Sequence, residues 1–109
     1  MNTYATVLRR ENSGWRSSSK VITSGEGLKE VFIPHTEDLG LARLGDAYIY
    51  YQPKLMDMEV GVTAKIRDKF GEMHYMCSPL LIIFCDGAVP REMVAIEEID
   101  SIINSLELL

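Results

Sequence analysis

Apolar and polar residues alternate most regularly between positions 58 and 67. The apolar positions are Met58, Val60, Val62, Ala64 and Ile66, and the positions between them are Glu59, Gly61, Thr63, Lys65 and Arg67. A period of two predicts a strand with one buried and one solvent-facing side. The next residues, Asp68-Lys69-Phe70-Gly71, suit a tight turn in which Gly71 adopts the left-handed conformation. We expect residues 72–77 to be the antiparallel partner and Ser78-Pro79 to end that strand.

A continuous apolar run covers residues 80–85, between Pro79 and the turn at Asp86-Gly87. A run of this length predicts a strand that is buried on both faces. Pro90 suits the first residue of a helix, where a missing N–H costs nothing. Beyond it, one stripe at helical spacing consists of Met93, Ile96, Ile99, Ile103 and Leu106. This stripe predicts an amphipathic helix of about four to five turns that packs on the sheet.

The rest of the chain predicts a first hairpin and two further strands. Segments with strand composition are 4–9, 15–23, 28–34 and 47–52. The first two are expected to pair across a turn that ends at Gly14, and Pro53 is expected to end the last. Before that last strand, Thr36 precedes two acidic residues and suits a helix N-cap, while Gly40 and Gly45 would keep such a helix short.

These elements together predict an α+β fold. The expected architecture is a twisted antiparallel sheet, or a partly closed small barrel, with a C-terminal amphipathic helix packed on it. A chain of 109 residues is expected to form a single domain over 1–109. An open sheet edge is expected at residues 47–52. Covering this edge is the reason to predict a homodimer.

Composition narrows the class of protein. Apolar residues make up 47% and charged residues 25% of the chain, which is typical of a globular protein. The start, MNTYATVLRR, lacks the apolar core of a secretory signal, and the longest apolar run is far shorter than the roughly 20 residues of a membrane span. Two cysteines are too few for a disulfide framework. We therefore expect a cytoplasmic protein without membrane contact.

Charge is distributed unevenly along the sequence. Residues 1–85 hold ten acidic and ten basic residues, whereas residues 86–109 hold six acidic residues and only Arg91, so the net charge of -5 lies in the C-terminal segment. This makes nucleic acid an improbable partner. Three acids in the predicted helix, Glu97, Glu98 and Asp100, lack an intrahelical basic partner, and we predict that they bind a basic protein. A helix surface that is merely solvated is the alternative.

Candidate chemistry in the sequence is sparse. Cys77 and Cys85 are eight residues apart, too far for the usual zinc-ligand pair, and His74 and Cys77 point to opposite faces of a strand. Cys85 has no histidine nearby in the sequence that would make it a nucleophile. We therefore predict no catalytic residue, no metal and no cofactor. An enzyme would instead require His35, Arg43, Glu72 and His74 to converge on one cleft.

The C-terminal third resembles one known class by its layout. The sequence CSPLLIIFCDGAVPREMVAIEEIDSIINSLELL at residues 77–109 consists of a strand, a buried strand, an acidic turn and a terminal helix. This order is similar to the end of the small dimeric toxins of plasmid toxin–antitoxin systems, the gyrase poisons and mRNA interferases. The resemblance implies a curled antiparallel sheet with a C-terminal helix. Gyrase poisons end in a Trp-Gly tail, whereas this chain ends in Glu107-Leu108-Leu109.

The sequence therefore predicts a small acidic protein-binding module without catalytic activity. An inhibitor, an immunity-type protein or an accessory protein of a bacterium, phage or plasmid fits this description. Two alternatives remain: a curled-barrel toxin or nuclease of the toxin–antitoxin type, and a protein that binds a small ligand. The ligand-binding alternative relies on methionine and tyrosine surfaces, because Met adapts its shape and aromatic rings offer flat contacts.

Overall fold

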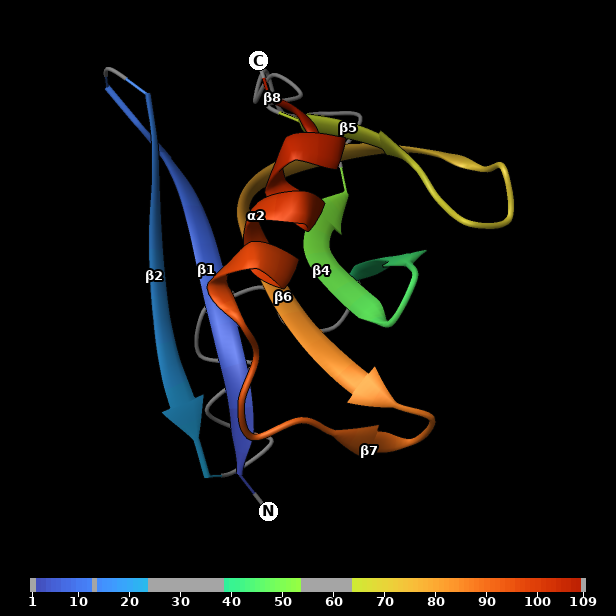
Figure 1. Cartoon of the computed structure of the whole chain (residues 1–109). Coiled ribbons are helices and arrows are strands. Elements are labelled where there is room, and N and C mark those ends of the chain that lie inside the picture. The colour runs from blue at the N-terminus through green and yellow to red at the C-terminus, as the bar shows by residue number, and fades with distance from the viewer. Residues whose placement is uncertain (1, 13, 24–38, 54–63, 109) are drawn as a thin grey trace.

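The computed structural model describes residues 2–12, 14–23, 39–53 and 64–108. They form a mostly-sheet architecture, an open antiparallel sheet with one short helix lying over one face (Figure 1). The strands are β1 (Thr3–Glu11), β2 (Gly14–Ile22), β3 (Gly40–Leu44), β4 (Ala47–Pro53), β5 (Ala64–Arg67), β6 (Met73–Asp86), β7 (Val89–Pro90) and β8 (Glu107–Leu108), and the helix is α2 (Ile96–Ser105). The order across the sheet is β2-β1-β6-β4-β3, which is consistent with the predicted α+β class.

The N-terminal hairpin is confirmed. β1 and β2 pair without a register break from Thr3 opposite Ile22 to Glu11 opposite Gly14. β2 is an outer strand of the described sheet, and its side chains from Arg16 to Val21 are exposed. The hairpin therefore presents its basic residues to solvent at one side of the molecule (Figure 1).

Residues 40–44 form strand β3, so the short helix expected to reach Gly40 and beyond is wrong there. They pair with β4 through a turn in which Gly45 has a φ of 58°. At Gly40 a side chain would collide with the Tyr51 ring, so glycine permits the close approach of β3 and β4. The expected open edge at residues 47–52 is also wrong, because β4 lies between β6 and β3. The predicted strand at 28–34 and the N-cap at Thr36 lie outside the described residues.

The hairpin of β5 and β6 confirms the predicted turn. Gly71 has a φ of 85°, and its N–H donates to the Asp68 carbonyl at 3.0 Å. Ala64 and Ile66 are buried and Arg67 is exposed, as the alternating pattern predicts. The earlier positions of that pattern, residues 58–63, lie outside the described residues.

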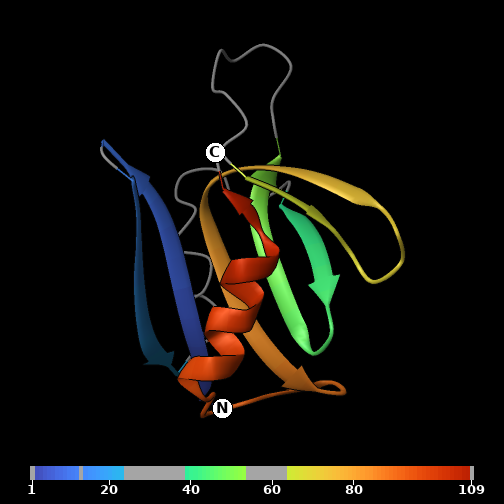
Figure 2. The same cartoon turned by 45° about the horizontal axis from the view of Figure 1, so that its top comes forward.

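β6 is the central strand, and it continues through Ser78-Pro79, where the sequence predicted a break. The pairing with β4 shifts at this point, from Tyr51 opposite Leu80 to Gln52 opposite Cys77, so the two residues form a bulge rather than an end. Residues 80–85 are all buried, as predicted. Leu80, Ile82 and Phe84 belong to the cluster that includes the buried residues of α2, and Leu81, Ile83 and Cys85 belong to a second cluster. Figure 2 shows α2 running over one face of the sheet.

The C-terminal helix begins later than predicted. Pro90 belongs to β7 rather than to a helix, because the chain here stays extended: Arg91 N–H donates to the Phe84 carbonyl at 2.8 Å, and Tyr4 N–H donates to the Arg91 carbonyl at 2.9 Å. Ile96 is then the first helical residue and is 69% exposed, so its predicted place against the sheet is wrong. Ile99 and Leu106 are buried in the cluster as predicted, and Ile102, which the predicted stripe did not include, is buried with them. Among the described helices, none is long and apolar enough to cross a membrane.

Candidate functional site: a groove beside Arg91

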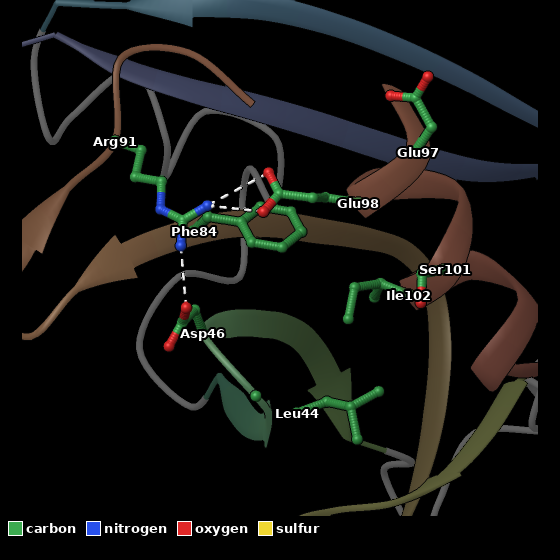
Figure 3. Close-up of a pocket in the computed structure, with 9 residues that line it drawn as sticks. Leu44, Asp46, Phe84, Arg91, Glu97, Glu98, Ser101 and Ile102 are labelled. Atoms are coloured by element: carbon green, nitrogen blue, oxygen red, sulfur yellow. Dashed lines mark hydrogen bonds and ion pairs between the residues drawn. The ribbon is translucent and has the colours of Figure 1, made fainter. Parts of the chain in front are cut away.

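A groove opens where α2 passes the end of the sheet. Its volume is about 340 Å³. Its lining consists of Leu44, Gly45, Asp46, Phe84, Arg91, Glu97, Glu98, Ser101 and Ile102 (Figure 3). The turn after β3, the end of β6, the segment after β7 and α2 all contribute, so four parts of the chain that are distant in sequence form this site.

Arg91 stands at the centre of an ion-pair cluster beside the groove. Its Nη2 lies 2.8 Å from Asp46 Oδ2, and its Nη1 lies 3.0 Å from Glu98 Oε1 (Figure 3). Its Nε lies 2.8 Å from Asp86 Oδ1. The guanidinium also lies over the Phe84 ring, 5.8 Å from its centroid. Hydrogen bonds to Asp86 and then Glu98 raise the pKa of Arg91, so its charge is permanent.

Two glycine turns bring the aspartates of this cluster together. Asp46 follows Gly45, and Asp86 precedes Gly87, whose φ is 62°. Cys85 N–H donates to the Asp46 carbonyl at 3.0 Å, and this hydrogen bond links the turn between β3 and β4 to the end of β6. Both turns therefore fall at one end of the sheet, and Arg91 links them to the helix through Glu98.

The three predicted partner-binding residues differ in their surroundings. Glu97, Glu98 and Asp100 are all exposed. Glu98 is paired with Arg91, so the sequence-based view of an uncompensated acidic face is wrong at that position. Glu97 lines the groove without an ion pair among the described residues, whereas Asp100 is not part of the groove lining. Of the three carboxylates, Glu98 is held in an ion pair, whereas Glu97 and Asp100 have no ion-pair partner among the described residues.

A second polar cluster lies under the turn between β5 and β6. His74 Nε2 lies 2.8 Å from Asp68 Oδ2, a carboxylate oxygen that accepts the ring N–H, and His74 Nδ1 forms a hydrogen bond with the Tyr51 hydroxyl at 2.6 Å. Asp68 Oδ1 also accepts the N–H groups of Phe70 and Glu72, at 2.8 and 2.9 Å. The hydrogen bond to His74 is the largest cause that lowers the pKa of Asp68, and burial is the largest cause that raises the pKa of Tyr51. The carboxylate therefore stays charged and the phenol keeps its proton.

This second cluster is poorly suited to bind a metal ion. Asp68, Glu72 and His74 bring ligand atoms within 4.8 Å of one another. However, both ring nitrogens of His74 and both oxygens of Asp68 already form hydrogen bonds within the protein. A metal ion would have to break the bond between these two side chains. We therefore assign the cluster a structural role, in which it ties β4, β6 and the turn together.

Of the four residues required for the enzyme alternative, Glu72 and His74 do come together, with ligand atoms within 4.8 Å of one another, whereas Arg43 packs elsewhere. Arg43 lies over the Tyr48 ring, 4.5 Å from its centroid. Tyr48 packs against the cluster on one face of the sheet, while His74 contacts Tyr51 of the opposite cluster. His35 lies outside the described residues. Cys85 is buried, and this burial is the first cause that raises the pKa of its thiol, which disfavours the thiolate that a nucleophile needs.

Sequence reasoning missed the Arg91 cluster because its members lie in different elements, although Asp86 and Glu98 are only five and seven positions from Arg91. Asp46 and Arg91 are separated by 45 positions, and no local spacing connects them. The usable indication was an aspartate beside a glycine at two places, Gly45-Asp46 and Asp86-Gly87, of which only the second was predicted as a turn. No protein-family model, curated protein or solved structure matches the chain.

Replacing Arg91 by methionine tests the cluster. We expect the melting temperature to fall by ~5 °C, because three carboxylates lose their shared cation and repel one another. Added salt is expected to restore part of the loss, since it screens that repulsion. Arg16→Met is the control, because its ion pair with Glu11 is exposed and 3.4 Å long. Equal melting temperatures for the two variants would show that the cluster does not stabilise the packing of α2 on the sheet.

Proposed function

We propose that this protein is a small acidic protein-binding module, without catalytic activity, that binds a basic protein at α2. An inhibitor, an immunity-type protein and an accessory protein all fit this description. The observation that carries the proposal is the exposure of Met93 and Ile96, at 84% and 69%, at the start of the helix. Large apolar side chains placed beside exposed acids resemble the centre and the rim of a protein interface.

The charges of this region support a basic partner. Glu92, Glu97 and Asp100 are exposed around the two apolar residues, and no described base other than Arg91 follows Asp86 in the chain. Arg91 is already engaged by three carboxylates. A surface of this kind attracts a basic protein over distances near the Debye length and accelerates association.

The finer shape of the fold belongs to the same proposal. We propose that the sheet curls toward a partly closed barrel beneath an amphipathic α2. Pairing of β5 with both β6 and β8 supports the curl. The buried Ile99 and Ile102, together with the exposed Glu97 and Asp100, support the two-sided helix. A cytoplasmic location is supported by Cys77 and Cys85, which are buried thiols rather than a disulfide.

A homodimer remains a second proposal, and the charges restrict its geometry. Along the described order β2-β1-β6-β4-β3, β2 and β3 are the two outer strands. Antiparallel pairing of β2 with a second β2 about Ser18 would place Arg16 opposite Lys20, and like charges opposite one another are unfavourable. We therefore expect the homodimer to form through the outer strand β3 of each copy.

Binding kinetics test the proposed partner surface. A photo-crosslinking residue at position 96, in cells that express the protein, first identifies the partner. The double variant Glu97→Gln, Asp100→Asn is then compared with the wild type at two salt concentrations. We expect association to slow by about tenfold at low salt and to lose much of its salt dependence. Stability is expected to stay unchanged, because neither carboxylate is ion-paired within the described chain.

The matched control neutralises two acids outside the helix, Glu11→Gln with Glu107→Gln. It changes the net charge by the same amount, and we expect less than about a twofold effect on association. Equal rates and equal salt slopes for the wild type and the helix variant would contradict the proposal. In that case the acidic helix is only a solvated surface.

A further inference from the structure

The groove beside Arg91 combines an apolar floor with an acidic rim. Leu44, Phe84 and Ile102 supply the floor, and Phe84 and Ile102 are buried. The carboxylates of Asp46 and Glu97 stand on opposite sides of it (Figure 3). Its volume of about 340 Å³ lies near the lower end of the ~300–1,000 Å³ typical of whole small-molecule sites, so it suits a single long side chain.

The charge of the groove favours a cation. Arg91 is the one base among its lining residues, and its Nε, Nη1 and Nη2 are occupied by Asp86, Glu98 and Asp46. An anion would therefore meet an engaged guanidinium and a ring of carboxylates. Among the described residues, Asp46 Oδ1 and the carboxylate of Glu97 have no hydrogen-bond partner, so the rim retains acceptors for an incoming donor.

We propose that this groove binds an arginine side chain of the basic partner, an inference that rests on the proposed function. The methylene stem of the arginine lies on Leu44 and Ile102, and its guanidinium donates to Asp46, while Glu97 adds negative charge at the far rim. Arginine fits better than lysine, because its planar fork matches carboxylates and it is less strongly hydrated where one wall is apolar. Gly45 carries no side chain, which leaves the entrance open at the turn.

Three small probes test the inference with the whole protein. They are the N-acetyl, N-methylamide derivatives of arginine, lysine and norleucine, each titrated while the backbone amide signals are followed by NMR. We expect the arginine probe to shift the signals of Gly45, Ser101 and Ile102 with a dissociation constant in the millimolar range. The lysine probe is expected to bind at least about threefold more weakly, and the norleucine probe, which lacks the charge, to bind weakest.

Three variants locate the binding. Asp46→Asn is expected to weaken the arginine probe about fivefold, because it removes the charged acceptor. Ser101→Phe fills the groove without changing its charge and is expected to abolish the shifts. Asp100→Asn is the matched control, since this exposed helix acid does not line the groove, and binding is expected to stay the same.

The outcomes separate this inference from the proposed function. Arginine and lysine probes of equal strength, or equal weakening by Asp46→Asn and Asp100→Asn, would reduce the effect to general charge attraction and overturn the groove site. Absence of shifts at 50 millimolar probe, roughly the weak limit of a single side-chain contact, would overturn it too. Salt-dependent association of the partner would still stand in both cases and would leave the protein-binding proposal intact.

Discussion

Replacement of Ile82 by aspartate is expected to unfold the protein. Ile82 lies in the central strand β6, is 1% exposed, and pairs with Thr6 on one side and Ile49 on the other. No cation lies among the residues of its cluster, so a carboxylate there would be buried and unpaired. Such a charge costs about 3–5 kcal/mol or more, which approaches the whole stability of a small domain.

Ile96→Asp is the matched control, because it makes the same chemical change at an exposed position. Ile96 is 69% exposed and is the first residue of α2, where a negative charge interacts favourably with the helix dipole. We expect its melting temperature to stay within a few degrees of the wild type, whereas Ile82→Asp is expected to lose the cooperative transition. Circular dichroism melting curves distinguish the two. A folded Ile82→Asp would contradict the assignment of this strand to the core.

Local patterns predicted most of the strands, because a strand and its turns are encoded by apolar and turn-forming residues within a short stretch of sequence. The uninterrupted run at 80–85 predicted burial on both faces, and the turn at Asp68 to Gly71 predicted the hairpin of β5 and β6; both are confirmed. The burial and register of these segments depend on residues within a few positions of one another. Such information is present before any tertiary contact forms.

The errors arose where distant backbone groups decide the local structure. Pro90 is compatible with a helix start, but its neighbour Arg91 pairs through its backbone with Phe84 and Tyr4, and this keeps the segment extended. The predicted apolar stripe was wrong at its first two members, Met93 and Ile96, for the same reason: the helix begins only at Ile96. Sequence spacing likewise contained no sign that Asp46 would meet Arg91 across 45 positions.

Asp68 provides the second large expected effect. It is buried, and its carboxylate accepts hydrogen bonds from His74 and from two backbone N–H groups in the turn. Asp68→Ala removes both acceptor oxygens, and with them three hydrogen bonds, and leaves Nε2 of His74 without its acceptor. Because buried donors without acceptors are costly, we expect the melting temperature to fall by on the order of 10 °C.

The pH dependence of stability separates the charge of Asp68 from its packing. The pKa of this carboxyl is lowered in the folded protein, mainly by the hydrogen bond to His74, so its unfolded value of about 3.9 lies above the folded one. The carboxylate therefore stabilises the folded state fully above that unfolded value. This stabilisation is lost as the pH falls through the folded pKa.

Asp68→Asn keeps the shape and one acceptor oxygen but removes the charge. The melting temperatures of the wild type and this variant are to be compared between pH 7 and pH 2.5. We expect a steady difference above about pH 5 that shrinks below about pH 4, where the wild-type carboxyl takes up its proton. Tyr51→Phe is the control: it removes only the hydroxyl that donates to His74, so it is expected to lower stability while keeping the wild-type slope in acid. A difference between wild type and Asp68→Asn that stays constant down to pH 2.5 would mean that the turn is held by shape and not by the ionised carboxylate.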